Sequence, residues 1–463
     1  MAHPRSAVAI TVAIAIAAPA AFAQQAPAAS APPAPMVANF DSAWASMSRT
    51  YWDTVLVNGR WRAAHDSLRA IAAGVEDETR MRELIRALMA VPAQSHFVLI
   101  PRSVVTDESQ RDAADARGPA NNDEPGTIGL ELRMLGDTLV AWRVAPGSPA
   151  AAAGVRPGAT ITHFGRLSVD SMRKVLLAAT PHDTAATRLL LNTAAIGRLS
   201  GRAGDTLSIT VRDGRGRARA RRVALVRVPL PGRATKFGNL PTMVVNTTGD
   251  SVVLGNGSRG VRQYAPVIGF SAWFPVISGE LDERLFAARD ARGVVIDLRG
   301  NPGGVVGMLA GVSGHFLDSA VALGTMRGRG ATIHFVANPR KVDRAGRRVR
   351  TITAPLAILI DGYSGSTSEF FASGMQAIGR ARVFGVSSAG QALPALMVRL
   401  PNGDVLMHAI ADHEDAAGRR VEGKGVQPDE VTPLTRADLV AGRDAALEAA
   451  RAWLVTQQGR KSP

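Results

Sequence analysis

The chain has 463 residues, enough for two or three domains with buried cores. Its 46% hydrophobic and 20% charged residues are ordinary for a soluble globular protein, and the absence of cysteine excludes disulfides and thiolate chemistry. Fifty-four Lys and Arg residues against 39 Asp and Glu give a net charge of +15. This charge favours loose association with an anionic membrane surface but says little about the fold.

The first 23 residues are typical of a cleavable secretory signal peptide. One arginine precedes an apolar run, and Ala21-Phe22-Ala23 forms an A-x-A cleavage site. The run is too short for a confident membrane span. The sequence therefore predicts a periplasmic or secreted protein that begins at Gln24, followed by an extended Ala/Pro-rich linker over 24–38.

The rest of the chain divides by its periodicity into an α/β protein of several domains. Three- and four-residue apolar spacing predicts helices at the start, short alternating runs predict a β-rich unit, and strands alternating with helices predict an α/β core. The expected segments are a helical domain (39–100), a polar loop (101–124), a β-rich domain (125–228) with an added helical stretch near 170–200, an α/β core (229–440), and a C-terminal amphipathic helix and tail (441–463), the helix starting at Arg436.

The segment ILIDGYSGSTSEFFASG, residues 358–374, carries the strongest chemical signal. An apolar strand ending at Ile360 leads through a turn of small residues into a helix that we expect to begin near Glu369. Such a turn can present a hydroxyl beside the free N–H groups of a helix N-terminus, where an oxyanion is favoured. Ser366 is the candidate nucleophile; the alternative is that these serines only cap the helix.

A second segment, GVVIDLRGNPGG at 293–304, predicts a buried central strand ending in a glycine-rich turn. Gly303 and Gly304 can adopt positive φ and let backbone N–H groups approach a ligand closely, as an oxyanion hole requires. The alternative is a tight strand–helix turn without a chemical role.

Together these motifs resemble the C-terminal-processing and tricorn-core family of serine peptidases. DLRGNPGG, GYSGSTSE and EGKGVQPD (422–429) follow one another as in that family, and the similarity covers roughly 40–435. The resemblance implies a peptidase core of the crotonase-like or ClpP-like type. It also implies a PDZ-like module at 125–228, because GTIGLEL and VAPGSPAAAAGVRPG resemble that domain.

The resemblance offers two catalytic arrangements, and the residues favour one of them. A Ser/Lys dyad would need a lysine where this chain has Gln391, and a neutral amide cannot accept the serine proton. The tricorn-like Ser–His–Ser–Glu branch is matched by Ser95-His96 and Glu422. By this similarity His96 is the general base, and Ser95 and Glu422 orient its ring.

Each of these assignments has a plainer alternative. His96 could be a structural histidine, and Glu422 a surface carboxylate paired with Arg419, Arg420 or Lys424. His413 is a rival base, although its DHED setting predicts an exposed polar turn. A displaced lysine such as Lys424 is the least favoured base.

The resemblance also implies where the substrate binds. The oxyanion hole would use the N–H of Thr367 and that of Gly303 or Gly304. In the PDZ-like unit, a peptide C-terminus would bind along Gly126, Thr127, Ile128, Gly129 and Leu130. One departure weakens this second site, because Ala159 stands where such domains usually carry an acidic residue.

Other signals point away from cofactors and nucleic acid. LGNGSRG (254–260) is followed by a strand-like run, which argues against a dinucleotide site, and the basic RGRARARR (215–222) has no interleaved aromatics. No H-E-x-x-H or Cys/His cluster predicts a metal. We therefore expect a cofactor-independent, exported serine endopeptidase that acts on unfolded or C-terminally exposed polypeptides. The alternative is a non-catalytic member of the fold that binds peptides or apolar ligands.

Overall fold

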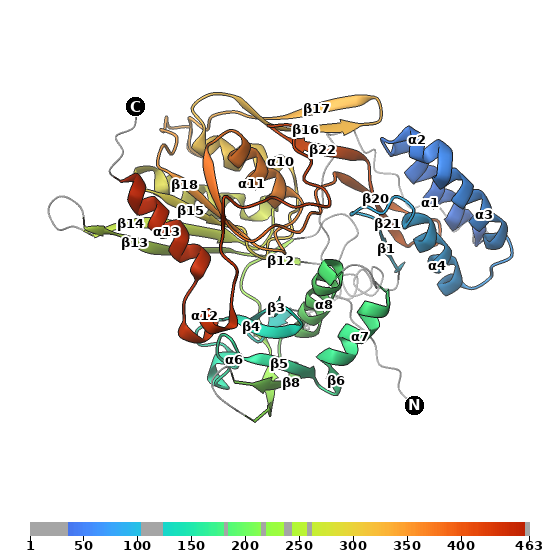
Figure 1. The fold of residues 1–463 in the computed structure, drawn as a ribbon, viewed down its shortest axis with the longest axis horizontal. Helices are drawn as coiled ribbons and strands as arrows, with labels where there is room; N and C mark the ends of the chain where they lie inside the picture. Colours follow the sequence, from blue (N-terminus) through green and yellow to red (C-terminus); the bar gives the residue numbers. More distant parts are fainter. Residues whose placement is uncertain are drawn as a thin grey trace.

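The computed structural model describes residues 36–102, 124–179, 184–213, 219–235, 243–256 and 262–458. The predicted signal peptide, nearly all of the predicted linker and most of the predicted polar loop lie outside these residues. The described chain forms a helical unit, a β-rich unit and a larger α/β core (Figure 1). The predicted α/β architecture of several units is confirmed. Within the described ranges, no helix is long and apolar enough to cross a membrane.

The helical unit folds around buried aromatic side chains. Its elements are α1 (Val37–Thr50), α2 (Thr54–Leu56), a π-helical turn (Val57–Trp61), α3 (Arg62–Ala72) and α4 (Glu78–Met89). Trp61 is fully buried and donates from Nε1 to the carbonyl of Leu88 at 2.8 Å. From α4 the chain passes through Ser95 and His96 into β1 (Val98–Ile100), which pairs with β21 of the core. This pairing fixes the Ser95-His96 segment relative to the core.

The β-rich unit is a sheet with the strand order β3-β4-β5-β8-β9, covered by two helices. The predicted helical stretch near 170–200 is confirmed as α7 and α8, and α8 packs against β3. The elements are β2 (Pro125–Thr127), β3 (Leu130–Leu135), β4 (Thr138–Val144), α6 (Pro149–Ala152), β5 (Thr160–Phe164), β6 (Leu167–Ser168), α7 (Val169–Ala179), α8 (Thr184–Leu199), β7 (Gly201–Arg202), β8 (Thr206–Arg212), β9 (Arg221–Val226) and β10 (Val228–Pro229).

The core is built on a six-stranded sheet with the order β13-β14-β15-β18-β19-β23, parallel except for β13. Its elements are β11 (Arg233–Thr235), β12 (Met243–Val245), β13 (Thr247–Asn256), β14 (Arg262–Phe270), α9 (Ser278–Ala287), β15 (Val294–Asp297), α10 (Gly307–Ser313), β16 (Val321–Gly328), β17 (Ala331–Ala337), β18 (Leu356–Ile360), α11 (Thr367–Ala377), β19 (Ala381–Gly385), β20 (Ala395–Arg399), β21 (Val405–Ala409), β22 (Ala411–Asp415), β23 (Glu430–Val431), α12 (Arg436–Ala441) and α13 (Ala445–Gln457).

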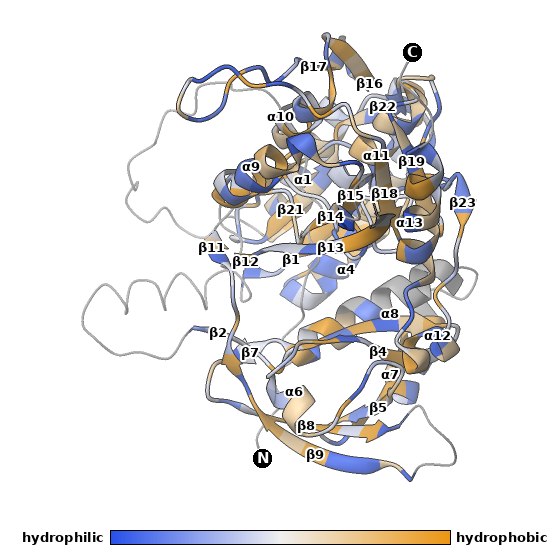
Figure 2. Ribbon diagram, turned by 90° about the vertical axis from the view of Figure 1, so that its left-hand side faces the viewer, coloured by the Kyte–Doolittle hydropathy of each residue, from blue (hydrophilic) through white to orange (hydrophobic). Residues whose placement is uncertain are grey.

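Helices cover both faces of this sheet, which explains its continuous apolar strands. Val295, Ala357 and Leu359 pack with α13 on one face, while Ile296 and Ile358 pack with α9 and α11 on the other. Figure 2 shows the apolar strands β15 and β18 inside these layers. Parallel strands end at the same edge of a sheet, so the turns after β15 and β18 meet there.

Two predicted boundaries need correction. The expected single helix from Arg436 to Leu454 is two helices, because Gly442 adopts a left-handed φ of 70° and ends α12 before α13 begins. Helix α11 begins at Thr367 rather than near Glu369, so the helix N-terminus lies directly beside Ser366.

The β-rich unit docks on the core through arginines stacked on an aromatic ring. The guanidinium carbons of Arg133 and Arg143 lie 3.8 and 3.9 Å from the ring centroid of Trp142. Arg133 donates to Asp361 at 2.9 Å and Arg143 to Asp297 at 2.7 Å. Asp361 follows β18 and Asp297 ends β15, so the contact reaches the two turns that meet at the sheet edge.

The docking contact should contribute to the stability of the fold. Arg133→Met leaves the partly buried Asp361 carboxylate without its cation, although Asp361 keeps the N–H groups of Gly300 and Tyr363. We expect the free energy of unfolding, measured by urea denaturation, to fall by about 2–3 kcal/mol. The matched control is Arg166→Met, at an exposed arginine for which no ion pair is found among the described residues. Equal effects of the two substitutions would contradict the prediction.

Candidate active site

Ser366 lies at the turn between β18 and α11, immediately before the first helical residue. Its backbone has φ 52° and ψ −117°, a conformation that non-glycine residues rarely adopt and that stores strain at functional sites. The side chain is buried, and no hydrogen-bond partner for its Oγ exists among the described residues. Because Oγ makes no capping bond, the reading of Ser366 as a simple helix cap is not favoured.

At Gly303 the turn after β15 packs closely against Ser366. A Cβ on Gly303 would lie 2.6 Å from the Cβ of Ser366 and 2.8 Å from the carbonyl oxygen of Gly365, and its φ is 101°. Only glycine fits there. The hydroxyl of Thr367 donates to the carbonyl of Gly304 at 2.9 Å, which ties the two turns together.

Buried Asn301 organises the same contact. Its Nδ2 donates to the carbonyl of Phe270 at 2.8 Å, and its Oδ1 accepts from the N–H of Gly303 at 3.0 Å. Its carbonyl accepts from the N–H of Gly365 at 3.0 Å. The Gly303 N–H is therefore engaged, whereas no acceptor is found for the N–H groups of Gly304 and Thr367 among the described residues.

The second group of predicted residues is also brought together, by segments over 300 residues apart. One oxygen of Glu422 accepts from the N–H of Ser95 at 2.8 Å, and the other accepts from the Ser95 hydroxyl at 3.0 Å and from the N–H of Ala392 at 2.8 Å. The Ser95 hydroxyl lies 2.7 Å from Nδ1 of His96. Burial raises the pKa of Glu422 above its ordinary value, against these hydrogen bonds.

These contacts define the proton positions on His96. Ionised Glu422 can only accept, so the Ser95 hydroxyl donates a hydrogen bond to Glu422 and accepts one from the Nδ1–H group of His96. Nε2 then carries the lone pair, and it is buried with no partner in the described structure. Burial lowers the pKa of His96 to about 4, so the ring is neutral at neutral pH. His96 also has a left-handed φ of 62°.

The segment Gln391-Ala392 joins the two groups. The carbonyl of Gln391 accepts from the N–H of Ser366 at 2.9 Å, while the next residue, Ala392, donates to Glu422. Gln391 thus contacts the Ser366 turn through its backbone. Oγ of Ser366 and Nε2 of His96 are both unpaired here and do not bond each other.

Glu369 is a site residue that the sequence reasoning missed. It is fully buried, and its carboxylate accepts from Ser388 Oγ at 2.5 Å, Gly390 N at 2.7 Å, Ser366 N at 2.9 Å and Gln391 N at 3.0 Å. It therefore holds the backbone of Ser366 and the 388–391 loop in one arrangement. The signal was present in the sequence: Ser366 and Glu369 have the S-x-x-E spacing of a capping box.

Glu369 gives a pH prediction. Burial raises the pKa of Glu369 to about 7, with a further contribution from Glu422. Four donors point at its two oxygens, so the carboxylate and not the acid fits this arrangement. We expect kcat/KM for an unfolded polypeptide to rise as pH rises through about 7.

The variant Glu369→Gln tests this assignment. It should lower kcat by up to about 100-fold, because the N–H groups of the new amide point at other donors and displace the Ser366 turn. It should also move the acid limb of the profile toward the His96 pKa of about 4. The exposed Glu448→Gln is the control and should keep the limb near 7. If the acid limb of the pH profile stays near pH 7 in Glu369→Gln, a group other than Glu369 is responsible for that limb.

Two expectations from the sequence, about the surroundings of His413 and of Glu422, are wrong. The DHED segment is not an exposed turn: it lies in β22, where His413 is buried and stacks on Phe370 with centroids 3.8 Å apart. Glu422 is not a surface carboxylate, since Arg419 and Arg420 pair with Asp415 and Asp412 instead.

The predicted peptide-binding residues lie in the β-rich unit, apart from both groups. Gly126 and Thr127 belong to β2, which pairs with β7 on one side and β10 on the other. Gly129 has φ 71° and donates to Thr127 Oγ1 at 2.9 Å. Across the described ranges, no hydrogen bond or ion pair joins these residues to Ser366 or His96.

Comparisons with known proteins agree with the geometry. The model of peptidase family S41 matches residues 272–432. A carboxyl-terminal-processing protease of Picosynechococcus sp. is 26% identical over 309 residues, 66% of this chain and 64% of the relative. A carboxy-terminal-processing protease of Bartonella bacilliformis is 29% identical over 158 residues, 34% of each chain. The chain thus spans less than two thirds of the length of these curated relatives.

Solved structures show the same fold over nearly the whole chain. The photosystem II D1 C-terminal processing protease has a TM-score of 0.54 at 19% identity and covers 91% of this chain and 97% of its own. Mature CPAF has a TM-score of 0.57 at 13% identity and covers 92% and 98%. Residues 272–432 therefore form a serine-type peptidase domain that matches family S41, and through this domain the chain is similar to carboxyl-terminal-processing proteases.

Proposed function

We propose that the protein is an exported serine endopeptidase that cleaves unfolded or C-terminally exposed polypeptides through an acyl-enzyme on Ser366. The observation that carries the proposal is that Ser366 has a strained backbone and a buried hydroxyl without a hydrogen-bond partner, at the edge where two turns meet. The same part of the chain is linked through Gln391-Ala392 to the hydrogen-bonded residues His96, Ser95 and Glu422. Strain and free polar groups of this kind gather at catalytic sites.

In the proposed mechanism, Ser366 Oγ attacks the scissile carbonyl carbon and Nε2 of His96 accepts its proton. The imidazolium that forms is stabilised through Ser95 by the Glu422 carboxylate, and His96 then protonates the leaving amine. Water hydrolyses the acyl-enzyme by the same proton path. Oγ and Nε2 are not hydrogen-bonded in the free protein, and catalytic hydrogen bonds often tighten only in the substrate complex.

The tetrahedral oxyanion would be bound by the N–H groups of Thr367 and Gly304. Thr367 opens α11, so its N–H lies at the positive end of that helix. Gly304 is favoured over Gly303 because the N–H of Gly303 already donates to Asn301. Of the two glycines that the sequence left open as the second oxyanion-hole donor, we therefore propose Gly304.

We assign substrate capture to the β-rich unit, as a PDZ-like domain. Strand β3 is at an edge of its sheet, and α8 packs beside it, which is the arrangement that takes up a peptide as an added strand. Strand β2 is paired on both sides, so its backbone groups are engaged. The C-terminal carboxylate of a bound peptide would therefore contact residues 128–130 rather than Gly126 and Thr127.

The test is hydrolysis of a denatured model protein by the mature chain beginning at Gln24, compared with the same protein in its native fold. We expect rapid cleavage of the denatured form only. A second pair, a peptide with a free C-terminus and the same peptide amidated, tests capture: the free form should have the lower KM. Equal KM values would contradict the PDZ-like assignment and leave the peptidase proposal intact.

A further inference from the structure

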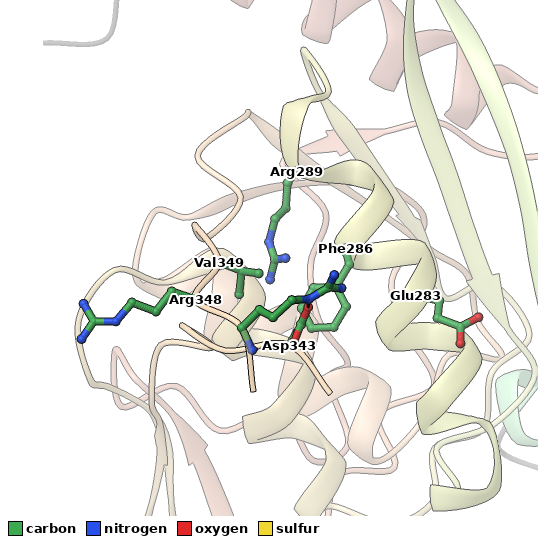
Figure 3. A pocket seen from close by; sticks show the side chains of 7 residues that line it. Glu283, Phe286, Arg289, Asp343, Arg348 and Val349 are labelled. Atoms are coloured by element: carbon green, nitrogen blue, oxygen red, sulfur yellow. Dashed lines mark hydrogen bonds and ion pairs between the residues drawn. The ribbon is translucent and has the colours of Figure 1, made fainter. Parts of the chain in front are cut away.

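A basic surface lies between α9 and the segment 341–353 of the core. Two adjoining cavities of about 480 and 680 Å³ share Arg289, Arg348 and Val349 in their walls. Figure 3 shows the first cavity, with the Arg289 side chain reaching from the 3-10 turn that follows α9 (Ala288–Asp290) toward Val349 and Phe286. None of the residues assigned to the peptidase site lines either cavity.

Only some of the cations that line this surface form ion pairs. The lining cations are Arg289, Lys341, Arg347, Arg348 and Arg350, and the lining acids are Glu283, Asp318 and Asp343. Arg347 is paired with Asp343 and Arg350 with Asp290. Among the described residues, no ion pair is found for the other three cations, Arg289, Lys341 and Arg348.

Arg289 is the least compensated of these cations. Its guanidinium carbon lies 4.0 Å from the ring centroid of Phe286, and its Nε and Nη2 are covered without a hydrogen-bond partner in the described structure. Burial lowers its pKa; Asp343, Asp282 and Asp290 oppose this and Arg340 adds to it. Arg289 is partly buried, and two of its guanidinium nitrogens lack a partner, so a bound anion that accepts from them would be favoured.

Two of the neighbouring carboxylates, Asp343 and Asp282, are engaged by other groups and form no ion pair with Arg289. Asp343 accepts from the N–H groups of Ala345 and Arg347 besides the Arg347 side chain. Asp282 accepts from His315 at 3.0 Å and from Arg340 at 2.5 Å. No carboxylate among the described residues forms an ion pair with Arg289, so a bound anion would supply a contact that these side chains do not make.

We propose that this surface binds a phosphate group through Arg289, Lys341 and Arg348. Phosphate oxygens match the guanidinium fork, and three cations suit a dianion better than a single carboxylate. Thr351 and Thr353 line the second cavity and add hydroxyl donors. The group would be free phosphate or the headgroup of an anionic lipid; the inference does not depend on the peptidase proposal.

Calorimetric titration with sodium phosphate, at fixed ionic strength in sodium chloride, tests the site. We expect saturable binding by the wild-type chain and at least about tenfold weaker binding by Arg289→Leu. Arg60→Leu changes net charge equally at an exposed arginine of the helical unit and should bind as wild type. Unchanged peptidase activity and circular dichroism report that Arg289→Leu is folded. Should it not fold, Arg348→Leu, at an exposed position, replaces it.

A second arm distinguishes the two sources. Vesicles of phosphatidylcholine with phosphatidic acid, whose phosphate is a monoester, are compared with vesicles holding equal phosphatidylglycerol. Binding to phosphatidic acid that Arg289→Leu loses, without binding of free phosphate, assigns a lipid headgroup. Absence of binding in both arms, or equal binding by wild type and Arg289→Leu, would overturn the proposal.

Discussion

Ser366→Ala is expected to abolish hydrolysis of a denatured model protein, with a fall in kcat of about four to six orders of magnitude. Ser366 Oγ is the unbonded hydroxyl beside the free N–H groups of Thr367 and Gly304, so no other group replaces its attack. The substitution removes only the oxygen and keeps the backbone bonds to Gln391 and Glu369. Stability should therefore change little, as a thermal melt of both proteins would show.

The matched control is Ser387→Ala. Ser387 is exposed and its hydroxyl donates to Gln427 at 2.8 Å, in the loop that carries Gln391. The Ser387→Ala variant should cleave the denatured protein at the wild-type rate. Cleavage by Ser366→Ala at a comparable rate would show that another residue is the nucleophile.

His96→Ala is the second large effect, and kcat should fall by about four orders of magnitude. In the proposed mechanism Nε2 of His96 is the general base; it has no partner among the described residues, and at neutral pH the ring is unprotonated because its pKa is lowered to about 4. The loss should persist at every pH between 6 and 9. This pH independence separates a missing base from a shifted pKa.

Lys424→Ala is the control for a displaced lysine base. Lys424 is exposed, and its neighbour Glu422 has turned inward toward Ser95. We expect wild-type activity. A silent His96→Ala together with an inactive Lys424→Ala would replace the tetrad with a Ser/Lys dyad.

Much of this arrangement could be predicted from the sequence because local patterns carried it. The apolar runs at 294–297 and 356–360 gave two fully buried parallel strands, and strand order then brings their glycine- and serine-rich turns to one edge. Ser95, His96 and Glu422 were grouped only through the family resemblance. The structure now shows hydrogen bonds among them.

The remaining features depend on contacts that no local pattern reports. DHED reads as polar, yet His413 is buried in β22 because alternate residues of that strand face Phe370 and the core. Glu369 reads as a helix-capping residue, and its role in holding the 388–391 loop appears only when residues about 20 positions apart come together. The Arg133–Asp361 contact likewise joins separate units.

The most direct test of the central claim is covalent labelling of the intact protein with a fluorophosphonate, followed by peptide mass mapping. The account predicts one label on Ser366, present in the wild type and in Lys424→Ala and absent from His96→Ala. No label at Ser366, in a wild-type chain that binds unfolded polypeptide, would contradict it and indicate a non-catalytic binding protein.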